Sequence, residues 1–171
     1  MSTQTNLENF GWNDNWASQF AELAIADGIP GRVLCEYRRR YTVHTAGGVL
    51  DGDVTGAFRH GHPHQEAFPT VGDWVAIVPV AGEEKGRIRA VLPRRSAFKR
   101  SAPGRTSEIQ VMAANVDTVF LVSGLDNDFN IRRIERYLTM AYESGANPVI
   151  VLNKCDLESD LAGRIHRFSG H

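Results

Sequence analysis

The sequence predicts two folds in succession: a small closed β-barrel of the OB type, followed by the first β-α-β part of an α/β domain. Three observations support this prediction. Between residues 32 and 91, short runs of alternating apolar residues are separated by glycines. From residue 109 onward, nearly unbroken apolar runs replace the alternation, as in strands buried on both faces. An amphipathic helix pattern lies between two of these runs.

A helix is expected before the barrel. Asn13 or Asp14 can cap its first turn, and Trp16, Phe20 and Leu23 recur at helical spacing on one face. Large aromatic side chains in this pattern more often cover a neighbouring core than bind a ligand. We therefore expect the tryptophans to pack on the barrel.

Five strands are predicted for the barrel. Closure of the sheet removes exposed edges, which a domain this short cannot cover otherwise. The expected strands are residues 33–37, 41–45, 49–50, 73–80 and 86–92.

The segment 93–108 is rich in serine, glycine, proline and basic residues, so it is predicted to be a linker or a mobile loop. The predicted domain boundary lies at its end. Residues 1–108 would form the helix and an RNA-binding OB domain, and residues 109–171 would begin the second domain.

In the second domain, residues 116–122 and 149–152 are predicted strands that pair in parallel. Residues 123–130 are expected to be a polar loop, and the residues at 147–148 a turn. Asn130 can cap the intervening helix and Gly145 can end it. The apolar face of this helix would be Ile131, Ile134, Leu138 and Ala141, and Leu157, Leu161 and Ile165 suggest one more helix.

The composition is that of a folded soluble protein, with 42% hydrophobic and 23% charged residues. No apolar run approaches the roughly 20 residues that cross a bilayer. The polar N-terminus does not resemble a signal peptide. Cys35 and Cys155 are far apart and lack paired spacing, so a reduced, cytoplasmic protein is expected.

The net charge is −1, but the basic residues are clustered. No acidic residue lies between Arg87 and Arg105, and a second cluster begins at Arg38. Barrels of this type present a basic face and aromatic side chains to oligonucleotides, although a solvated surface is the alternative. The candidate RNA-binding residues are Arg38, Arg39, Arg87, Arg89, Arg94, Arg95, Lys99 and Arg100.

The tetrapeptide Asn153-Lys154-Cys155-Asp156 follows the second strand of the β-α-β unit, where ligands of open α/β sheets bind. The Asp156 carboxylate can accept hydrogen bonds from guanine N1–H and the 2-amino group, neither of which adenine offers. The Asn153 amide can bond near guanine N7 and O6, and the stem of Lys154 can cover the base. The candidate guanine-binding residues are therefore Asn153, Lys154, Cys155 and Asp156, and the alternative is a capped strand-to-helix turn.

Other motifs are weaker. The sequence contains no G-x-x-x-x-G-K-[ST] phosphate loop, and the D-x-x-G pattern at residues 53–56 is interpreted as a turn in the barrel. His60, His62 and His64 alternate, which permits metal binding or contact with RNA phosphates. A polar loop at the barrel rim is favoured, because Gly61 and Pro63 oppose regular structure. No catalytic and no metal-binding residue is assigned.

The order of motifs resembles the circularly permuted, ribosome small-subunit-dependent GTPases of the RsgA/YjeQ family. The resemblance covers the chain to about Leu157. It rests on Val71-Gly72-Asp73-Trp74-Val75, Pro93-Arg94-Arg95-Ser96, Ala114-Asn115-Val116-Asp117 and Asn153-Lys154-Cys155-Asp156, with Phe10-Gly11-Trp12 and Pro30-Gly31-Arg32-Val33 near the N-terminus.

The resemblance implies an OB domain that contacts small-subunit rRNA, and a circularly permuted P-loop GTPase domain whose guanine motif comes first. GTP would be the substrate. Mg²⁺ and Zn²⁺ are implied only for later parts of such proteins, because this chain lacks the P-loop, both switches and the zinc ligands. The expectation is an N-terminal fragment, monomeric and inactive alone as a GTP hydrolase. The alternative is an RNA-binding OB module without nucleotide function.

Overall fold

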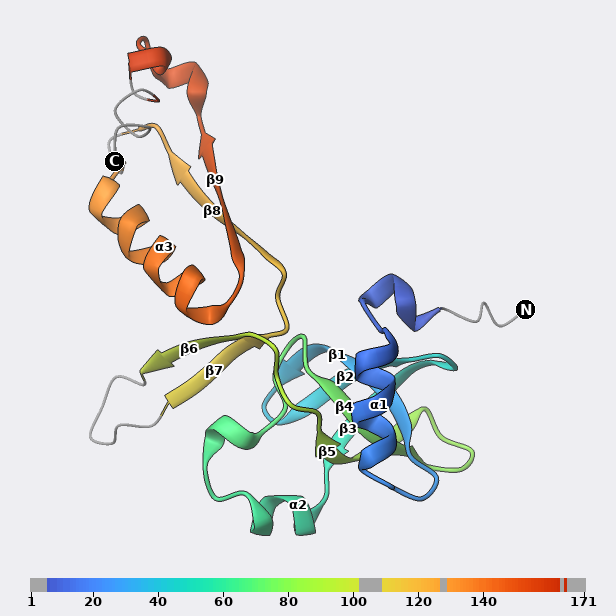
Figure 1. Ribbon diagram of the computed structural model, residues 1–171. Helices are drawn as coiled ribbons and strands as arrows, with labels where there is room; N and C mark the ends of the chain where they lie inside the picture. The colour runs from blue at the N-terminus through green and yellow to red at the C-terminus, as the bar shows by residue number, and fades with distance from the viewer. Residues whose placement is uncertain (1–5, 102–108, 127–128, 164, 166–171) are drawn as a thin grey trace. The chain divides into compact units, whose positions relative to one another are not determined.

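The computed structural model describes residues 6–101, 109–126, 129–163 and 165 (Figure 1). The chain divides into two units, residues 1–116 and residues 117–171, and each is described by itself.

The first unit contains a closed five-stranded barrel, which confirms the predicted OB-type fold. Its strand order is β1-β2-β3-β5-β4, and β4 closes the barrel by pairing with β1. All neighbours are antiparallel except β3 and β5, which are parallel. The strands are β1 (Ile29–Tyr37), β2 (Arg40–Thr45), β3 (Gly48–Val54), β4 (Trp74–Pro79) and β5 (Lys85–Val91).

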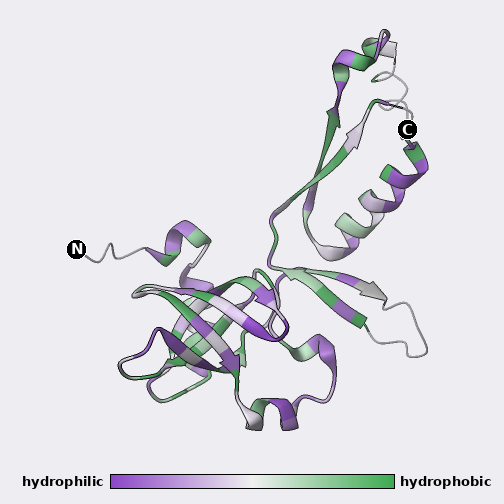
Figure 2. Ribbon diagram, turned by 180° about the vertical axis from the view of Figure 1, so that it is seen from behind, coloured by the Kyte–Doolittle hydropathy of each residue, from purple (hydrophilic) through white to green (hydrophobic). Residues whose placement is uncertain are grey.

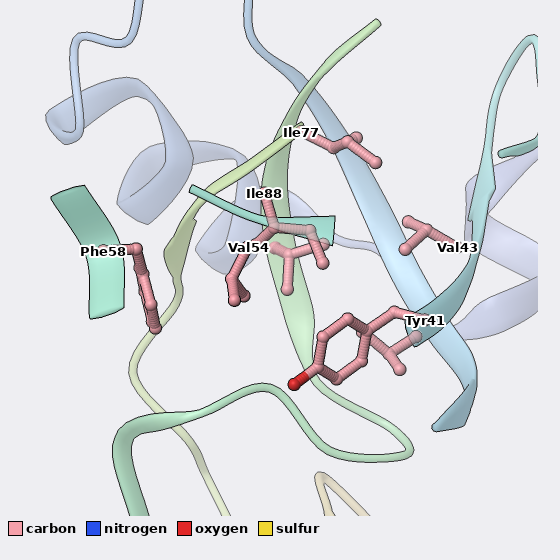
Figure 3. Packing of buried hydrophobic residues seen from close by; sticks show 8 residues of the cluster. Tyr41, Val43, Val54, Phe58, Ile77 and Ile88 are labelled. Carbon is pink, nitrogen blue, oxygen red and sulfur yellow. The ribbon is translucent and has the colours of Figure 1, made fainter. Parts of the chain in front are cut away.

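Alternating residues of these strands fill the barrel interior (Figure 3). Val33, Val43, Ile77 and Ile88 have no exposed surface, and burial of each such side chain stabilises the fold by about 1.5–3 kcal/mol. Gly86 lies so close to this core that an added Cβ would come within 2.6 Å of the Ile77 side chain. The barrel is therefore closely packed.

The N-terminal segment covers the outer side of the barrel with η1 (Leu7–Phe10) and α1 (Asp14–Glu22). The Asn13 side chain caps α1 by accepting hydrogen bonds from the amides of Asn15 and Trp16 at 3.1 and 3.2 Å. Trp16 packs with Trp74 in a second buried cluster. The tryptophans therefore cover the barrel, as the sequence predicts.

Two short helices, α2 (Gly56–Gly61) and η2 (Gln65–Ala67), connect β3 to β4. The D-x-x-G pattern is the end of β3 and the start of α2, rather than an isolated turn. The Thr55 hydroxyl caps α2 by accepting a hydrogen bond from the Phe58 amide at 3.1 Å. This cap explains why regular structure continues through His60 to Gly61, where a loop was expected.

The predicted linker after residue 92 is in part a hairpin of β6 (Ala97–Ser101) and β7 (Ile109–Ala114); residues 102–108 lie outside the described part. β7 belongs to the first unit because the amide of Ala114 donates to the Val71 carbonyl at 2.9 Å. Gly72 has a φ of +87°, and an added Cβ would come within 2.0 Å of the Ala114 carbonyl oxygen. This close pairing extends the first unit to Val116, whereas the sequence places the boundary at residue 108.

The second unit is a β-α-β unit with the parallel pairing that the sequence predicts. The Asn130 side chain caps its helix, and Gly145 ends the helix with a φ of +85°. The expected turn at residues 147–148 is instead the start of a strand, because the Asn147 amide donates to the Asp117 carbonyl at 2.9 Å. The elements are β8 (Thr118–Gly124), α3 (Ile131–Ser144), β9 (Asn147–Asn153) and η3 (Cys155–Leu157).

The β8–β9 sheet is covered on one face. α3, whose hydrophilic and hydrophobic residues alternate along its length, packs against both strands (Figure 2). On the other face, Phe120 and Val122 remain 65% and 63% exposed. The apolar run of β8 suits burial on both faces, but among the described elements α3 alone covers the pair, so one apolar face stays exposed.

Where the sequence suggests a last helix, residues 161–163 are helical, and the Asp160 side chain accepts a hydrogen bond from the Gly163 amide at 3.0 Å. Across the described residues, no helix is both long enough and apolar enough to cross a bilayer.

Candidate functional site

The candidate guanine site lies where the two parallel strands of the second unit end. The register pairs Gly124, the last residue of β8, with Asn153, the last residue of β9. The amide of Leu125 continues the pairing by donating to the Asn153 carbonyl at 2.9 Å. Lys154 has a φ of +58°, and this left-handed residue turns the chain out of the strand and into η3.

The first two residues of the motif stabilise the turn itself. The Asn153 side-chain oxygen accepts a hydrogen bond from the Lys154 amide at 2.9 Å. The Lys154 ammonium forms an ion pair with Asp126, which follows β8. The Asn153 side chain therefore stabilises its own turn, and the Lys154 side chain connects the two loops that flank the site.

The Asp156 carboxylate has a different position. It is exposed, and no hydrogen bond or ion pair joins it to any residue in the described part of the chain. Its neighbour Cys155, at the variable position of the motif, donates from Sγ to the Leu152 carbonyl at 3.2 Å. Asp156 is thus available to accept two hydrogen bonds from a base at this end of the sheet.

Two residues of this site were missed by sequence reasoning. Asp126 lies 28 positions before Lys154, in a segment that reads only as a polar loop, and the strand pairing brings it there. Ser123 is 5% exposed, and its hydroxyl oxygen is buried without a partner near the same sheet end. Neither residue has a spacing that marks it in the sequence.

In the first unit, the candidate Arg94 is held by bonds within the protein. Its guanidinium forms two hydrogen bonds with the Asp73 carboxylate, at 2.8 and 2.7 Å. It also donates to the carbonyls of Glu66 and Phe68 at 2.6 and 2.7 Å. Asp73 has no exposed surface. These bonds involve all three nitrogens and use four of the five N–H donors of the guanidinium.

Other members of the predicted basic run also have partners. Lys99 forms an ion pair with Glu66, and the hydrogen bond from Lys99 lowers the pKa of the Glu66 carboxyl. The backbone amide of Arg95 donates to the Asn115 side chain at 2.8 Å, while its side chain is exposed. Arg100 lies in β6, and its side chain is outside the description. The acid-free stretch of sequence is therefore partly neutralised in three dimensions.

The remaining candidates are exposed on the barrel surface. Arg38 and Arg39 form the tip of the β1–β2 hairpin, with φ angles of +49° and +63°. Arg87 and Arg89 project outward from β5, and neither forms an ion pair with a residue that the structure describes.

The strand register brings the arginines of the hairpin and of β5 to the same part of the barrel surface. Arg40 pairs with Asp53 on β3, and Asp53 pairs with Arg87 on β5. Since neighbouring strands lie about 4.8 Å apart, Arg40 and Arg87 are about 10 Å apart across Asp53. Arg59 on α2 adds an ion pair with Asp53 at 2.9 Å. Sequence reasoning missed Arg59, because the parallel β3–β5 pairing that brings this region together leaves no local signal.

The three alternating histidines do not share one environment. His60 lies in α2, and His62 stacks on Phe58 with ring centroids 4.3 Å apart. His62 Nδ1 also forms a hydrogen bond with the Phe58 carbonyl at 2.9 Å. Nowhere in the described ranges do three His, Cys, Asp or Glu side chains gather as metal ligands.

Comparison with known proteins finds relatives of this chain. A sequence model of the RsgA GTPase family matches residues 91–169. The chain is 46% identical over 165 residues to the small ribosomal subunit biogenesis GTPase RsgA of Opitutus terrae, a match that covers 92% of this chain and 45% of that protein. The chain is thus similar to RsgA GTPases along nearly its whole length. The RsgA protein of Streptomyces coelicolor is 43% identical, with 93% of this chain and 42% of that protein covered.

Solved structures show the same fold. YjeQ from Thermotoga maritima superposes with a TM-score of 0.63 at 24% identity, over 84% of this chain and 48% of that one. YloQ, described as a circularly permuted GTPase, gives a TM-score of 0.61 at 20% identity. The predicted family resemblance and the predicted fold class are thus confirmed. The chain spans about half the length of the relatives and structures that it matches.

Proposed function

We propose that this chain supplies two binding functions to a small-subunit biogenesis GTPase of the RsgA family: recognition of guanine by its second unit and of ribosomal RNA by its barrel. The observation that carries the proposal is the exposed Asp156 carboxylate beyond the ends of two parallel strands, which forms no bond with the described residues. Ligands of open α/β sheets bind at this place.

Asp156 selects guanine over adenine. Its carboxylate accepts from N1–H and from the 2-amino group of guanine, whereas adenine has no donor at either position. A site built to pair such donors rejects a base that lacks them, because the carboxylate is then left without a partner. Asn153 and Lys154 keep the loops that flank Asp156 in place, and the Lys154 stem offers an apolar surface to the base.

The barrel binds rRNA through its exposed arginines. Arg38 and Arg39 at the hairpin tip, and Arg87 and Arg89 on β5, are placed to contact phosphates. OB barrels bind oligonucleotides with the face of strands 2 and 3 and the loop between strands 1 and 2, which here is the hairpin tip. The matched relatives are named small ribosomal subunit biogenesis GTPases, which supports rRNA of the small subunit as the RNA that this chain binds.

The chain itself is not expected to hydrolyse GTP. Backbone amides and a lysine around the phosphates supply much of the binding in P-loop sites, and no such sequence occurs here. Mg²⁺ and Zn²⁺, which the family resemblance implies, are likewise assigned to other parts of such proteins. The chain would act as a monomer in the cytoplasm, where its exposed thiols at Cys35 and Cys155 stay reduced.

A change of base preference tests the guanine site. Xanthine carries a carbonyl where guanine has its 2-amino group, so Asp156→Asn exchanges an acceptor for a donor at the matching position. Calorimetry or ligand NMR should show that the natural chain binds GDP weakly but better than ADP, and that Asp156→Asn prefers xanthosine diphosphate.

The control is Glu143→Gln, which makes the same chemical change at an exposed position of α3 and should leave the GDP preference unchanged. Equal binding of GDP and ADP by the natural chain would contradict the proposal, as would an unchanged preference in Asp156→Asn. Purified chain that turns over GTP would refute the expected lack of hydrolysis.

A further inference from the structure

A pocket of about 230 Å³ lies within the first unit, between the β1–β2 hairpin, the segment around η2, and β7. Neither the candidate guanine site nor the arginines of β5 contribute to it. Its chemically informative lining residues are Glu36, Arg39, Tyr41, Gln65, Phe68 and Gln110.

Tyr41 lines this pocket although its ring is part of the barrel core. Tyr41 is 2% exposed. Figure 3 shows its oxygen turned away from the aliphatic side chains of that core. No hydrogen bond joins the hydroxyl to any of the described residues. The oxygen is not one of the fully buried polar atoms that lack a partner, so it reaches the pocket, where a polar ligand can form a hydrogen bond with it.

One wall of the pocket suits a flat ring. The Arg39 guanidinium lies over the Phe68 ring, 4.9 Å from its centroid. Arg39 reaches this place from a left-handed backbone, which side-chain-bearing residues rarely adopt. The amide of Arg39 donates to Glu36 at 3.0 Å, which holds the hairpin tip in this conformation. Arginine planes and aromatic rings are the surfaces on which unstacked bases are held.

The polar groups of the pocket suit a neutral ligand. One carboxylate, Glu36, and one guanidinium, Arg39, balance each other, which disfavours a free anion. The amides of Gln65 and Gln110 offer both donors and acceptors, and neither forms a hydrogen bond with a residue in the described part. A heterocycle whose edge carries donors and acceptors can pair with these groups and with the Tyr41 hydroxyl.

We infer that this pocket holds one unstacked nucleobase of the RNA that the barrel binds. The inference rests on the RNA part of the proposed function. Exposed Arg38 and Arg40 flank Arg39 in the chain, so the backbone phosphates beside an inserted base would meet positive charge. A free nucleoside lacks these phosphates, so the pocket selects a base within a strand. The Glu36 carboxylate favours a base with an exocyclic amino group, so uracil, which has none, should bind less tightly.

The test uses the full chain and single-stranded RNA homopolymers of about ten nucleotides, with fluorescence anisotropy as the readout. Tyr41→Phe removes only the hydroxyl. We expect it to weaken binding of the best homopolymer about fivefold, the value of one hydrogen bond. The loss should be smaller for oligo-U, and replacing one base of the best RNA by an abasic residue should weaken binding by the natural chain more than binding by Tyr41→Phe.

Arg39→Ala and Arg38→Ala form a matched pair, because they remove the same charge from adjacent left-handed positions and only Arg39 lines the pocket. The Arg39 variant should lose at least about tenfold more affinity, since stacking is lost as well as charge. Identical affinities and abasic penalties for the natural chain and Tyr41→Phe would overturn the pocket while leaving the RNA function intact. Absence of RNA binding by the natural chain, at low salt and to isolated small subunits alike, would overturn both.

Discussion

The strands of the β-α-β unit are more continuously apolar than those of the barrel, yet the barrel buries its apolar side chains more completely. Val33 and Ile77 of the barrel have no exposed surface, whereas Phe120 and Val122 of β8 are more than 60% exposed. The barrel closes on itself, so each strand pairs with two neighbours and its inner face is covered from all sides. Within the described residues, β8 and β9 pair only with each other, and a helix covers one face of the pair.

The apolar pattern of a strand therefore does not determine how much of that strand is buried in the folded chain. The apolar run of β8 specifies a strand that suits burial on both faces, and the strand forms and pairs in parallel as its sequence dictates. Whether both faces are then covered depends on how many other elements are present. The barrel should therefore be the stable part of the chain and the β-α-β unit the marginal one.

The largest effect is expected from removing the buried cation of the barrel. Arg94→Ala leaves the fully buried Asp73 carboxylate without its charged partner and frees the carbonyls of Glu66 and Phe68. Breaking such a pair from one side costs about 3–5 kcal/mol. All three tryptophans lie in the first unit, so denaturant unfolding followed by tryptophan fluorescence reports this loss directly.

Arg89→Ala is the matched control for this prediction, because Arg89 is an exposed arginine without an ion pair to the described residues. Its effect on stability should stay within about 0.5 kcal/mol. If both variants unfold at the same denaturant concentration, the Arg94–Asp73 pair does not hold the barrel together.

Hydrogen exchange compares the two units directly. Amides of β2 and β4 should be protected at least about tenfold more strongly than those of β8 and β9, because the latter can open without disrupting the barrel core. Far-UV circular dichroism, to which α3 contributes, should likewise begin to change before tryptophan fluorescence does. Equal protection in both units and coincident transitions would show that the chain is one cooperative structure.

A smaller effect is expected at high pH, where Tyr41 titrates. Burial raises the pKa of Tyr41 from about 10 to about 12. Because the folded state holds the proton more tightly, barrel stability is complete below pH 10 and falls as the pH rises from 10 to 12. The slope is about 1.4 kcal/mol per pH unit, a loss on the order of 2–3 kcal/mol in all. The difference between natural chain and Tyr41→Phe in denaturant titrations isolates this contribution.

The smallest effects on stability are expected from removing the helix-capping side chains, one in each unit. Asn13→Ala and Asn130→Ala each remove one capping side chain and should each cost about 1 kcal/mol. Asn13→Ala should shift the tryptophan-detected transition, and Asn130→Ala only the part of the dichroism that reports α3. A shift of the tryptophan transition by Asn130→Ala would mean that the units unfold together.

Much of this architecture follows from local sequence signals. Alternation predicts the barrel strands, and Asn130 and Gly145 mark the ends of α3 through side-chain capping and a left-handed φ. The motif after β9 predicts the location of the candidate site, because strand order fixes where ligands bind in such sheets. These features depend on residues that are neighbours in the sequence.

Features that depend on distant partners were not predictable. Arg94 belongs to a basic run, and nothing local shows that Asp73, 21 residues earlier, takes its charge. The β6–β7 hairpin reads as a linker because its pairing spans residues 97–114 and its contacts with Val71 and Gly72 come from another loop. The Tyr41 pocket likewise forms only when the hairpin tip, η2 and β7 meet.

Co-sedimentation with purified ribosomal subunits across a range of salt concentrations tests most directly whether the barrel binds rRNA of the small subunit. We expect the chain to bind the small subunit and not the large one. The logarithm of its affinity should fall with the logarithm of the salt concentration, with a slope of about −0.7 to −0.9 per phosphate contact. Replacing Arg38, Arg39, Arg87 and Arg89 together by alanine should reduce that slope, while Glu143→Gln should not. Equal binding to both subunits, or no binding to the small subunit at low salt, would contradict the proposed rRNA function.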